Sequence, residues 1–347
     1  MRAFRSAILC LAVAAFADPA VAADPVADFY SHTTIRLLVS GDVGGSYDTD
    51  ARLVARYLPR HLPGNPSIVP ENMTGASGRL AANYTYNVGR KDGSVIAVVQ
   101  QTIAMGQALG EAGIQYDASR FNWIGSPVRP EEVLVVWHTT GIRSIAEAKV
   151  KEVVIGATSP TGTNYIYPKL ANEFLGTKFK IVTGYSGGGS IVLALERGEV
   201  EGRGANPWSE WKVIKPDWVR EQKIVPLVQM SLKRRADLPD VPLLMELAPN
   251  EEVRRIFEVV SITGSMGRPF VVAPEVPPER VAALRKAFAE TVADPDFLAD
   301  AARSRKEIEP ISGEELDRLV RRVLDTPKSA VDLLKAALAK GEKPAQK

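Results

Sequence analysis

Four glycine-rich loops are the segments of this chain best suited to bind a ligand, and each comes before a helical pattern. They are Gly44-Gly45-Ser46-Tyr47-Asp48, Thr74-Gly75-Ala76-Ser77-Gly78, Thr161-Gly162-Thr163-Asn164 and Ser186-Gly187-Gly188-Gly189-Ser190. A glycine loop that opens a helix directs unpaired backbone N–H groups and the positive end of the helix dipole at one place. The sequence therefore predicts a site of main-chain donors, which would hold a polar ligand without changing it chemically.

The amino terminus has the pattern of a cleaved secretory signal. Arg2 and Arg5 supply positive charge, residues 7–16 are apolar, and small residues at 20–23 offer a cleavage point. The apolar stretch is too short to cross a bilayer, for which about 20 residues are needed. We therefore expect residues 1–23 to be removed and the mature protein to be periplasmic. The cysteine of the chain, Cys10, lies inside this signal, so the mature chain offers no thiol nucleophile and no cysteine metal ligand.

Length and charge narrow the class of protein. The 347 residues are 45% hydrophobic, which is enough to bury a large core and to form two domains. The formal charge of +2 falls to about +1 when Arg2, Arg5 and Asp18 leave with the signal. This balance argues against nucleic acid as a partner, because a concentrated basic stripe is typical of proteins that bind it.

Short β-rich runs alternate with helical patterns along the chain. We expect strands at 35–39, 95–99, 133–137, 153–155, 180–182, 224–229 and 270–273, and helices at 49–62, 78–88, 145–149, 166–175, 190–197, 278–293 and 313–324. The alternation predicts βαβ units and mainly parallel sheets, with the glycine loops at the carboxyl ends of strands. Two crossings, near 127–132 and 255–263, would insert one domain into the other. The expected limits are 24–127 with 256–347 for domain 1 and 128–255 for domain 2.

Enzymatic chemistry fits the sequence less well than binding. Residues 184–188 match the G-x-S-x-G pattern around a hydrolase nucleophile, here Ser186, but that fold needs its base histidine later in the chain. His32, His61 and His138 all precede Ser186, and none stands in a two-histidine metal motif. We therefore expect no enzyme, no metal site and no cofactor. A secreted hydrolase that uses Ser186 is the less favoured alternative.

Two further groups of side chains admit both a structural and a functional interpretation. Glu131-Glu132, Glu199 and Glu201 are candidate catalytic carboxylates, and surface placement is the simpler expectation for them. Asn206 and Trp208 belong to a tryptophan-rich segment. This segment either packs in the core or forms an aromatic wall to a cleft, where Asn206 would hydrogen-bond the ligand.

The order of these motifs resembles the extracytoplasmic receptors of tripartite tricarboxylate transporters (TctC-like or Bug-type receptors) over nearly all of the mature chain. The first loop is similar to the family pattern G-G-x-x-D-x-x-A-R, residues 71–78 to E-N-x-x-G-A-G-G, and residues 91–93 to P-D-G. Further similarities are Gly162-Thr163 to S-G-T, Tyr185-Ser186-Gly187 to Y-K-G, residues 198–201 to G-x-V-D, and residues 238–246 to L-P-D-V-P-x-x-x-E.

The resemblance implies an α/β protein with the two-domain, type II periplasmic-binding-protein fold and a hinged cleft. It implies a receptor that captures a small organic acid, a carboxylate, and delivers it to integral-membrane transporter subunits driven by an ion gradient. A sensory receptor that signals to a membrane kinase is the alternative that the sequence does not separate from it. We expect a monomer.

The loops and the resemblance together name the expected ligand-binding residues. These are Gly44, Gly45, Ser46, Tyr47, Asp48, Gly75, Ala76, Ser77, Gly78, Thr102, Thr161, Gly162, Thr163, Asn164, Tyr185, Ser186, Gly187, Asn206 and Trp208. Two departures from the family bear on the ligand. Asp42 would oppose a carboxylate if it pointed inward, and Arg203 would pair with a second carboxylate.

Overall fold

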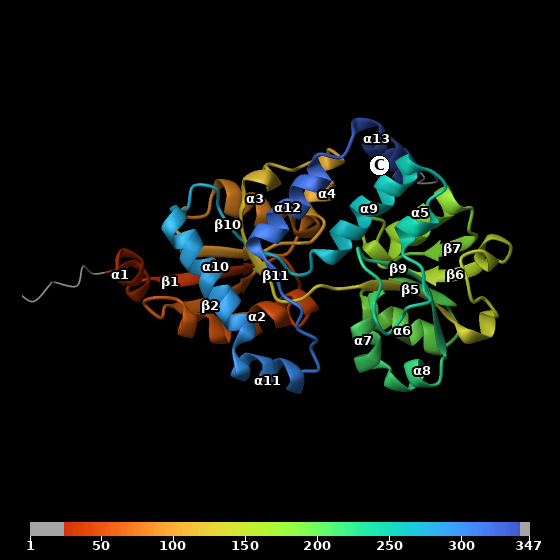
Figure 1. Ribbon diagram of the computed structural model, residues 1–347, viewed down its shortest axis with the longest axis horizontal. Helices are drawn as coiled ribbons and strands as arrows, with labels where there is room; N and C mark the ends of the chain where they lie inside the picture. The colour runs from red at the N-terminus through yellow and green to blue at the C-terminus, as the bar shows by residue number, and fades with distance from the viewer. Residues whose placement is uncertain (1–23, 341–347) are drawn as a thin grey trace, which may run out of the picture.

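Two α/β lobes make up the computed structural model, which describes residues 24–340 (Figure 1). The first lobe is built on a six-stranded sheet of order β11-β4-β10-β3-β1-β2, and the second on a five-stranded sheet of order β7-β6-β8-β5-β9. This arrangement confirms the expected two-domain α/β fold class. The expected signal peptide, with Cys10, lies outside the described residues.

The strands of the first lobe are β1 (Thr34–Val39), β2 (Ser67–Asn72), β3 (Val95–Val98), β4 (Asn122–Ser126), β10 (Phe270–Val272) and β11 (Ile311–Ser312). Those of the second lobe are β5 (Glu132–Trp137), β6 (Val153–Gly156), β7 (Phe179–Val182), β8 (Gly202–Pro207) and β9 (Ile224–Met230). The sequence did not signal β2, β4, β8 or β11, which carry prolines, glycines and polar residues.

Both sheets are mixed, whereas mainly parallel sheets were expected. The strand β1 pairs in parallel with β2 and β3, and β6 with β7 and β8. In contrast, β10 runs antiparallel to β3 and β4, and β5 antiparallel to β8 and β9. Because β5 and β10 are the first strands formed after the chain changes lobe, each enters its sheet from the end at which the neighbouring strands finish.

Helices cover these sheets. Around the first lobe they are α1 (Pro25–Ser31), α2 (Ser46–His61), α3 (Arg79–Asn87), α4 (Ile103–Ala108), α10 (Pro278–Ala293), α11 (Pro295–Arg303) and α12 (Gly313–Leu324). Around the second lobe they are α5 (Thr163–Leu175), α6 (Gly188–Glu196), α7 (Trp208–Ile214), α8 (Pro216–Arg220), α9 (Glu251–Ser265) and α13 (Lys328–Ala339). Between residues 24 and 340, no helix is long and apolar enough to span a membrane.

The chain passes between the lobes three times. Residues 127–131 join β4 to β5, residues 266–269 join α9 to β10, and residues 325–327 join α12 to α13. The second crossing was expected at 255–263, but that segment lies inside the mostly buried helix α9. The helix α13 contacts α5 and α9, so the chain returns to the second lobe after α12. The domain limits given above stay a prediction.

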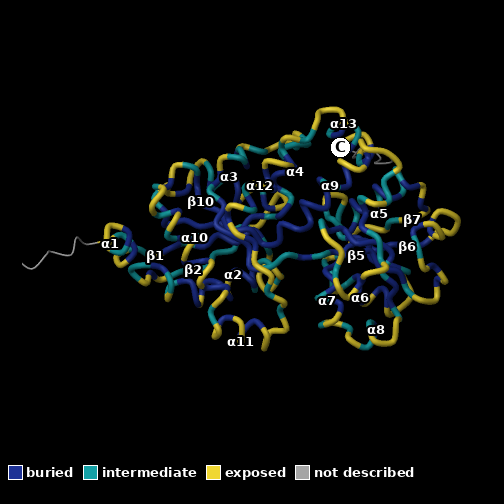
Figure 2. Tube along the Cα trace, in the orientation of Figure 1, coloured by how far each residue is buried: buried dark blue, intermediate teal, exposed yellow. Residues whose placement is uncertain are grey.

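One hydrophobic cluster extends through both lobes, and Figure 2 shows buried residues in the interior of each lobe. It contains Val95 and Trp123 from the first sheet, and Leu134 from the second sheet with Phe257 from α9. Contacts of α9 with α4 and α12 carry this packing from one lobe to the other. Burial of apolar area on that side therefore holds the lobes together, and it leaves the glycine loops to line the space between them.

Candidate functional site

The helices that follow the four glycine loops begin without a side-chain cap. The N-cap residues of α2, α3, α5 and α6 are Gly45, Gly78, Gly162 and Gly187. Elsewhere, α1, α9, α11 and α12 are capped by the side chains of Asp24, Asn250, Asp294 and Ser312. A side-chain cap occupies N–H groups of the first turn, and glycine leaves them for another acceptor. The four helices begin with glycine close to where the sequence predicted their starts, and the first turns of α4, α7, α8, α10 and α13 also have no side-chain cap.

The second and third loops meet across the gap between the lobes. Ser77 precedes α3 of the first lobe, and its hydroxyl oxygen lies 3.4 Å from that of Thr161, which precedes α5 of the second lobe. A cavity of about 160 Å³ beside this contact is lined by Ser77, Thr102 and Thr161 among others. Three of the expected site residues, separated widely in sequence, thus line one space.

The backbone of the second loop is fixed in conformations that favour glycine. Gly75 and Gly78 have φ angles of 133° and 83°, and Ala76 and Ser77 have φ angles of 47° and 54°. A Cβ at position 78 would lie 2.3 Å from Cγ of Gln100, so the loop is pressed against the end of β3. This close packing positions the Ser77 hydroxyl at the lobe boundary.

The first loop is fixed by Arg268, which comes from the second crossing and was not expected at the site. Its Nη2 donates to Ser46 Oγ at 3.2 Å, and its Cζ lies 4.5 Å from the ring centroid of Tyr47. The Tyr47 hydroxyl in turn donates to the Gly267 carbonyl at 3.4 Å and accepts from the backbone N–H of Gln101 at 3.1 Å. Burial raises the pKa of Tyr47, and the Arg268 charge partly opposes that rise. Tyr47 is therefore a neutral link between α2 and the crossing.

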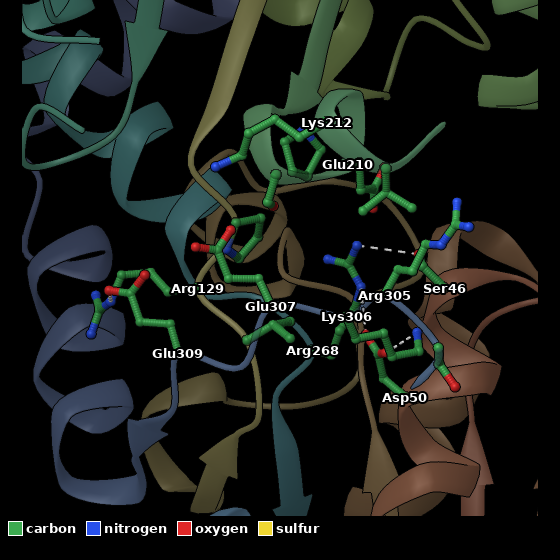
Figure 3. Close-up of a pocket in the computed structure, with 16 residues that line it drawn as sticks. Ser46, Asp50, Arg129, Glu210, Lys212, Arg268, Arg305, Lys306, Glu307 and Glu309 are labelled. Atoms are coloured by element: carbon green, nitrogen blue, oxygen red, sulfur yellow. Dashed lines mark hydrogen bonds and ion pairs between the residues drawn. The ribbon is translucent and has the colours of Figure 1, made fainter. Parts of the chain in front are cut away.

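A larger cavity, of about 430 Å³, opens between the lobes beside this loop (Figure 3). The first lobe and the crossing line it with Ser46, Asp50 and Arg268, and the second lobe with Glu210 and Lys212 among others. Asp50 is paired with Lys306, and its Oδ2 lies 3.9 Å from Nε of Arg268. The two cavities together show that the first three loops face the boundary between the lobes.

Asp48 braces the first loop from inside. Its Oδ2 accepts the N–H of Gly44 at 2.9 Å, and its Oδ1 accepts from Arg52 Nε at 2.8 Å and from Asn72 Nδ2 at 3.0 Å. The Arg52 guanidinium is the main cause that lowers the pKa of Asp48 to about 2. Asn72 also donates to the Gly41 carbonyl, so it joins the first two loops. Asp42 is exposed at the same loop, where its carbonyl accepts the N–H of Gly45.

Asn164 has a similar bracing role in the third loop. Its Oδ1 accepts from the N–H and the hydroxyl of Thr158, each at 3.2 Å. The next hydroxyl, that of Thr163, donates to Oε1 of Glu132 at 3.2 Å. Gly162 has little free space, because a Cβ there would lie 2.9 Å from Thr158 Oγ1.

Glu132 was expected at the surface, and the structure shows that it is buried, with 7% of its surface exposed. It begins β5 directly after the first crossing, beside Gly264 of α9, where an added Cβ would lie 2.3 Å from the hydroxyl of Tyr167 and 3.3 Å from Oε2 of Glu132. Burial raises the pKa of Glu132 to about 7, although Arg268 and Arg203 oppose that rise. The start of a strongly apolar strand, E-V-L-V-V-W, was the available signal for its burial.

The fourth loop and the tryptophan segment lie in the second lobe. Ser186 Oγ donates to Ser190 Oγ at 3.4 Å, and Tyr185 packs partly buried against the core there. Trp208 is 6% exposed and packs in the core with Trp211 and Trp218, which favours the structural interpretation of this segment. Asn206 is buried beside it, and its Oδ1 has no hydrogen-bond partner among residues 24–340.

The three histidines contact residues other than Ser186. His61 bonds Asp294 in the first lobe at 2.8 Å, His32 contacts Ser31 near the amino terminus, and His138 packs against Trp137. The triad geometry of a hydrolase needs a base within hydrogen-bond reach of the nucleophile. The contacts of these side chains therefore give no support to the hydrolase alternative.

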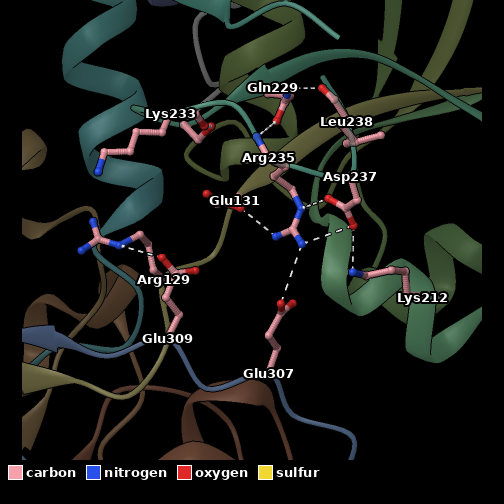
Figure 4. Close-up of polar contacts among 11 residues, drawn as sticks. Arg129, Glu131, Lys212, Gln229, Lys233, Arg235, Asp237, Leu238, Glu307 and Glu309 are labelled. Carbon is pink, nitrogen blue, oxygen red and sulfur yellow. Dashed lines mark hydrogen bonds and ion pairs between the residues drawn. The ribbon is translucent and has the colours of Figure 1, made fainter. Parts of the chain in front are cut away.

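Ion pairs join the lobes at one edge of the larger cavity (Figure 4). Arg235 follows β9, and its Nη1 lies 2.7 Å from Oε2 of Glu131 while its Nε lies 2.8 Å from Oδ1 of Asp237. Its Nη2 lies 3.8 Å from Oε1 of Glu307, which belongs to the segment between α11 and β11 of the first lobe. Arg129, in the first crossing, pairs with Glu309 and Glu315 of the first lobe.

Several solved structures with this fold are solute-binding proteins. A ligand-free TctC solute binding protein from Polaromonas is 21% identical, with a TM-score of 0.68, over 90% of this chain and 99% of that one. Rpa4515 of R. palustris, solved with adipate, is 22% identical, with a TM-score of 0.62, over 89% and 98%. The periplasmic binding protein BugD is 18% identical, with a TM-score of 0.61, over 88% and 98%. No family model and no curated protein matches the chain.

The chain therefore has a periplasmic-binding-protein fold. Within that class its fold is the one found in the TctC and Bug proteins, as its loop motifs predicted.

Proposed function

We propose that the protein is a periplasmic solute receptor that captures a small organic anion between its lobes. The observation that carries this proposal is the set of four helices with glycine N-caps, two in each lobe. Free N–H groups and the positive ends of helix dipoles stabilise negative charge. Water excluded from a closed cleft strengthens each of these hydrogen bonds.

A carboxylate is the anion that best fits the proposal. Rpa4515, which has the same fold, was solved with adipate, a dicarboxylate. The loops of this chain offer backbone donors and the hydroxyls of Ser46, Ser77 and Thr161, all of which can donate to carboxylate oxygens. Delivery to ion-gradient-driven membrane transporter subunits, by a monomeric receptor, is the further part of the proposal that rests on the motif resemblance.

A ligand screen tests the proposal on the mature chain, residues 24–347. We expect a library of organic acids to contain at least one compound that raises the melting temperature, because a ligand at 100 times its Kd stabilises the folded state by about 2.7 kcal/mol. Calorimetric titration of that compound should give one site per chain. A broad library without a single stabilising acid would contradict the proposal. Ester hydrolysis that is lost in Ser186→Ala would replace it with the hydrolase alternative.

A further inference from the structure

Arg203 is a buried arginine without an acceptor. It lies on β8, the central strand of the second sheet, level with Gly156 at the end of β6. Only 9% of its surface is exposed, and within residues 24–340 its guanidinium makes no hydrogen bond or ion pair. Its Cζ lies 5.6 Å from the ring centroid of Trp211, which supplies packing but no acceptor oxygen. Burial lowers the pKa of Arg203, the charges of Glu210 and Glu132 oppose that fall, and a bound anion would stabilise the buried charge further.

The guanidinium of Arg203 is directed at the first turn of α6. A Cβ at Gly188 would lie 2.5 Å from Nη2 and 3.1 Å from Cζ of Arg203, so the arginine approaches the backbone as closely as glycine permits. The helix α6 has nine residues, and its N-cap, Gly187, provides no side-chain cap. Two positive features, an arginine and the amino end of a helix, therefore face the same space.

That space is a cavity of about 260 Å³ between α6 and α7, lined by Gly188, Arg203 and Glu210 among others. Glu210 also lines the 430 Å³ cavity between the lobes, at the edge formed by the second lobe (Figure 3). Glu210 thus borders both cavities. The smaller cavity has room for a carboxylate group, because its volume is several times the roughly 30 Å³ that one water molecule occupies in the liquid.

We infer that Arg203 and the first turn of α6 form an anion subsite in the second lobe. The inference rests on the proposed function and specifies its substrate class, an organic acid with two anionic groups. One group binds at the loops before α2, α3 and α5, and the other at Arg203. A guanidinium suits the second role because it offers paired donors that match the two oxygens of a carboxylate.

Glu210 modulates this subsite. Glu210 lines the same cavity, and its charge favours the charged form of Arg203. Its negative charge opposes an incoming anion, so it lowers the affinity for a diacid. Glu210→Gln removes that charge with little change of shape, and we expect it to raise diacid affinity.

Calorimetry with matched acids tests the subsite directly. The pairs are butanoate and succinate, hexanoate and adipate, and benzoate and terephthalate, whose members differ by one carboxylate. We expect at least one diacid to bind ten times more tightly than its monoacid. Arg203→Gln should reduce that preference to less than threefold, and Arg203→Lys should keep part of it. Arg197→Gln is the control, because Arg197 is an exposed residue that follows α6 and pairs with Glu199.

The outcomes separate the subsite from the receptor function. Binding of monoacids as tight as that of diacids to the unchanged protein would overturn the subsite and leave the receptor function standing. A full diacid preference in folded Arg203→Gln would do the same. If none of these acids nor any of a broad library binds, the receptor function fails, and the subsite with it. Should Arg203→Gln not fold, Glu210→Gln decides, and unchanged or weaker diacid binding in that variant would refute the subsite.

Discussion

The hydroxyl oxygens of Ser77 and Thr161 lie 3.4 Å apart, although the two residues belong to different lobes and are 84 positions apart in sequence. Each hydroxyl stands in the loop that comes before a helix with a glycine N-cap. Both loops therefore approach the same point, where a ligand held by one is within reach of the other. We therefore expect that removal of a single hydroxyl at the lobe boundary changes the affinity for the ligand.

Thr161→Val tests that contact. The substitution keeps the shape of the side chain and removes its hydroxyl, so the variant should lose one hydrogen bond worth about 0.5–1.5 kcal/mol to ligand or to Ser77. We expect calorimetry to show ligand affinity lowered by roughly 2- to 12-fold, from the same figure. Thr326→Val, which removes a hydroxyl at the end of α12, should leave affinity unchanged. Equal affinity in both variants would remove Thr161 from the site.

Gly187→Val tests the main-chain donors of the fourth loop. Gly187 has extended backbone angles, and nothing lies within 4 Å of a Cβ placed there, so the fold should tolerate valine. The added side chain would stand at the entrance of α6 and block close approach of a ligand. We expect at least a tenfold loss of affinity at an unchanged ligand-free melting temperature. Gly75→Val is less informative, because a φ of 133° makes any side chain strained there.

Glu132→Gln tests the buried carboxyl beneath α9. Burial raises the pKa of Glu132 to about 7, so between pH 4.5 and 7 the folded state keeps a proton that the unfolded state releases. Its contribution to stability is therefore greatest at low pH and is lost as the pH rises through 7, by about 3 kcal/mol. Urea unfolding should show the variant more stable than the unchanged protein at pH 8 and similar to it at pH 4. If the variant gained more stability at pH 4 than at pH 8, the raised pKa of Glu132 would be contradicted.

Arg235→Gln tests the ion pairs at the edge of the cavity. Arg235 is 11% exposed at its side chain and Glu131 is 14% exposed, so loss of the arginine leaves a nearly buried carboxylate unpaired. We expect chemical denaturation to show a loss of about 3 kcal/mol. Glu307→Gln is the matched comparison: this partner is 49% exposed and 3.8 Å away, so its loss should cost less than about 1 kcal/mol. If the two variants lost similar amounts of stability, the prediction would be wrong, and the Arg235–Glu307 pair between the lobes would account for most of the effect.

The sequence predicted best those segments whose backbone conformation depends on glycine. The loops before α2, α3, α5 and α6 were predicted from local pattern alone, because a strand, a glycine turn and an apolar helix period are all local features. The structure adds what local pattern does not contain, namely that the loop at Ser77 faces the loop at Thr161. Such a contact depends on how two sheets are placed, which no short window of sequence records.

The charged residues around the cavities were harder to predict for a related reason. Glu132 and Arg268 lie in the two crossings or directly after them, where the burial of a side chain depends on both lobes. Their polarity alone predicts a surface position. Gly264 shows the compensation involved, because its missing side chain makes room chiefly for the hydroxyl of Tyr167, which interacts with Glu132. The reversed strands β5 and β10 have the same origin, since their direction follows from crossings that alternation does not reveal.

The third crossing has a practical consequence for watching the molecule at work. The first described helix, α1, lies at the far end of one lobe, while α13 packs against α5 and α9 of the other (Figure 1). A fluorescent dye attached near residue 28 would therefore move with the first lobe, and one near residue 335 with the second lobe. Energy transfer between them would report rotation of one half against the other in real time.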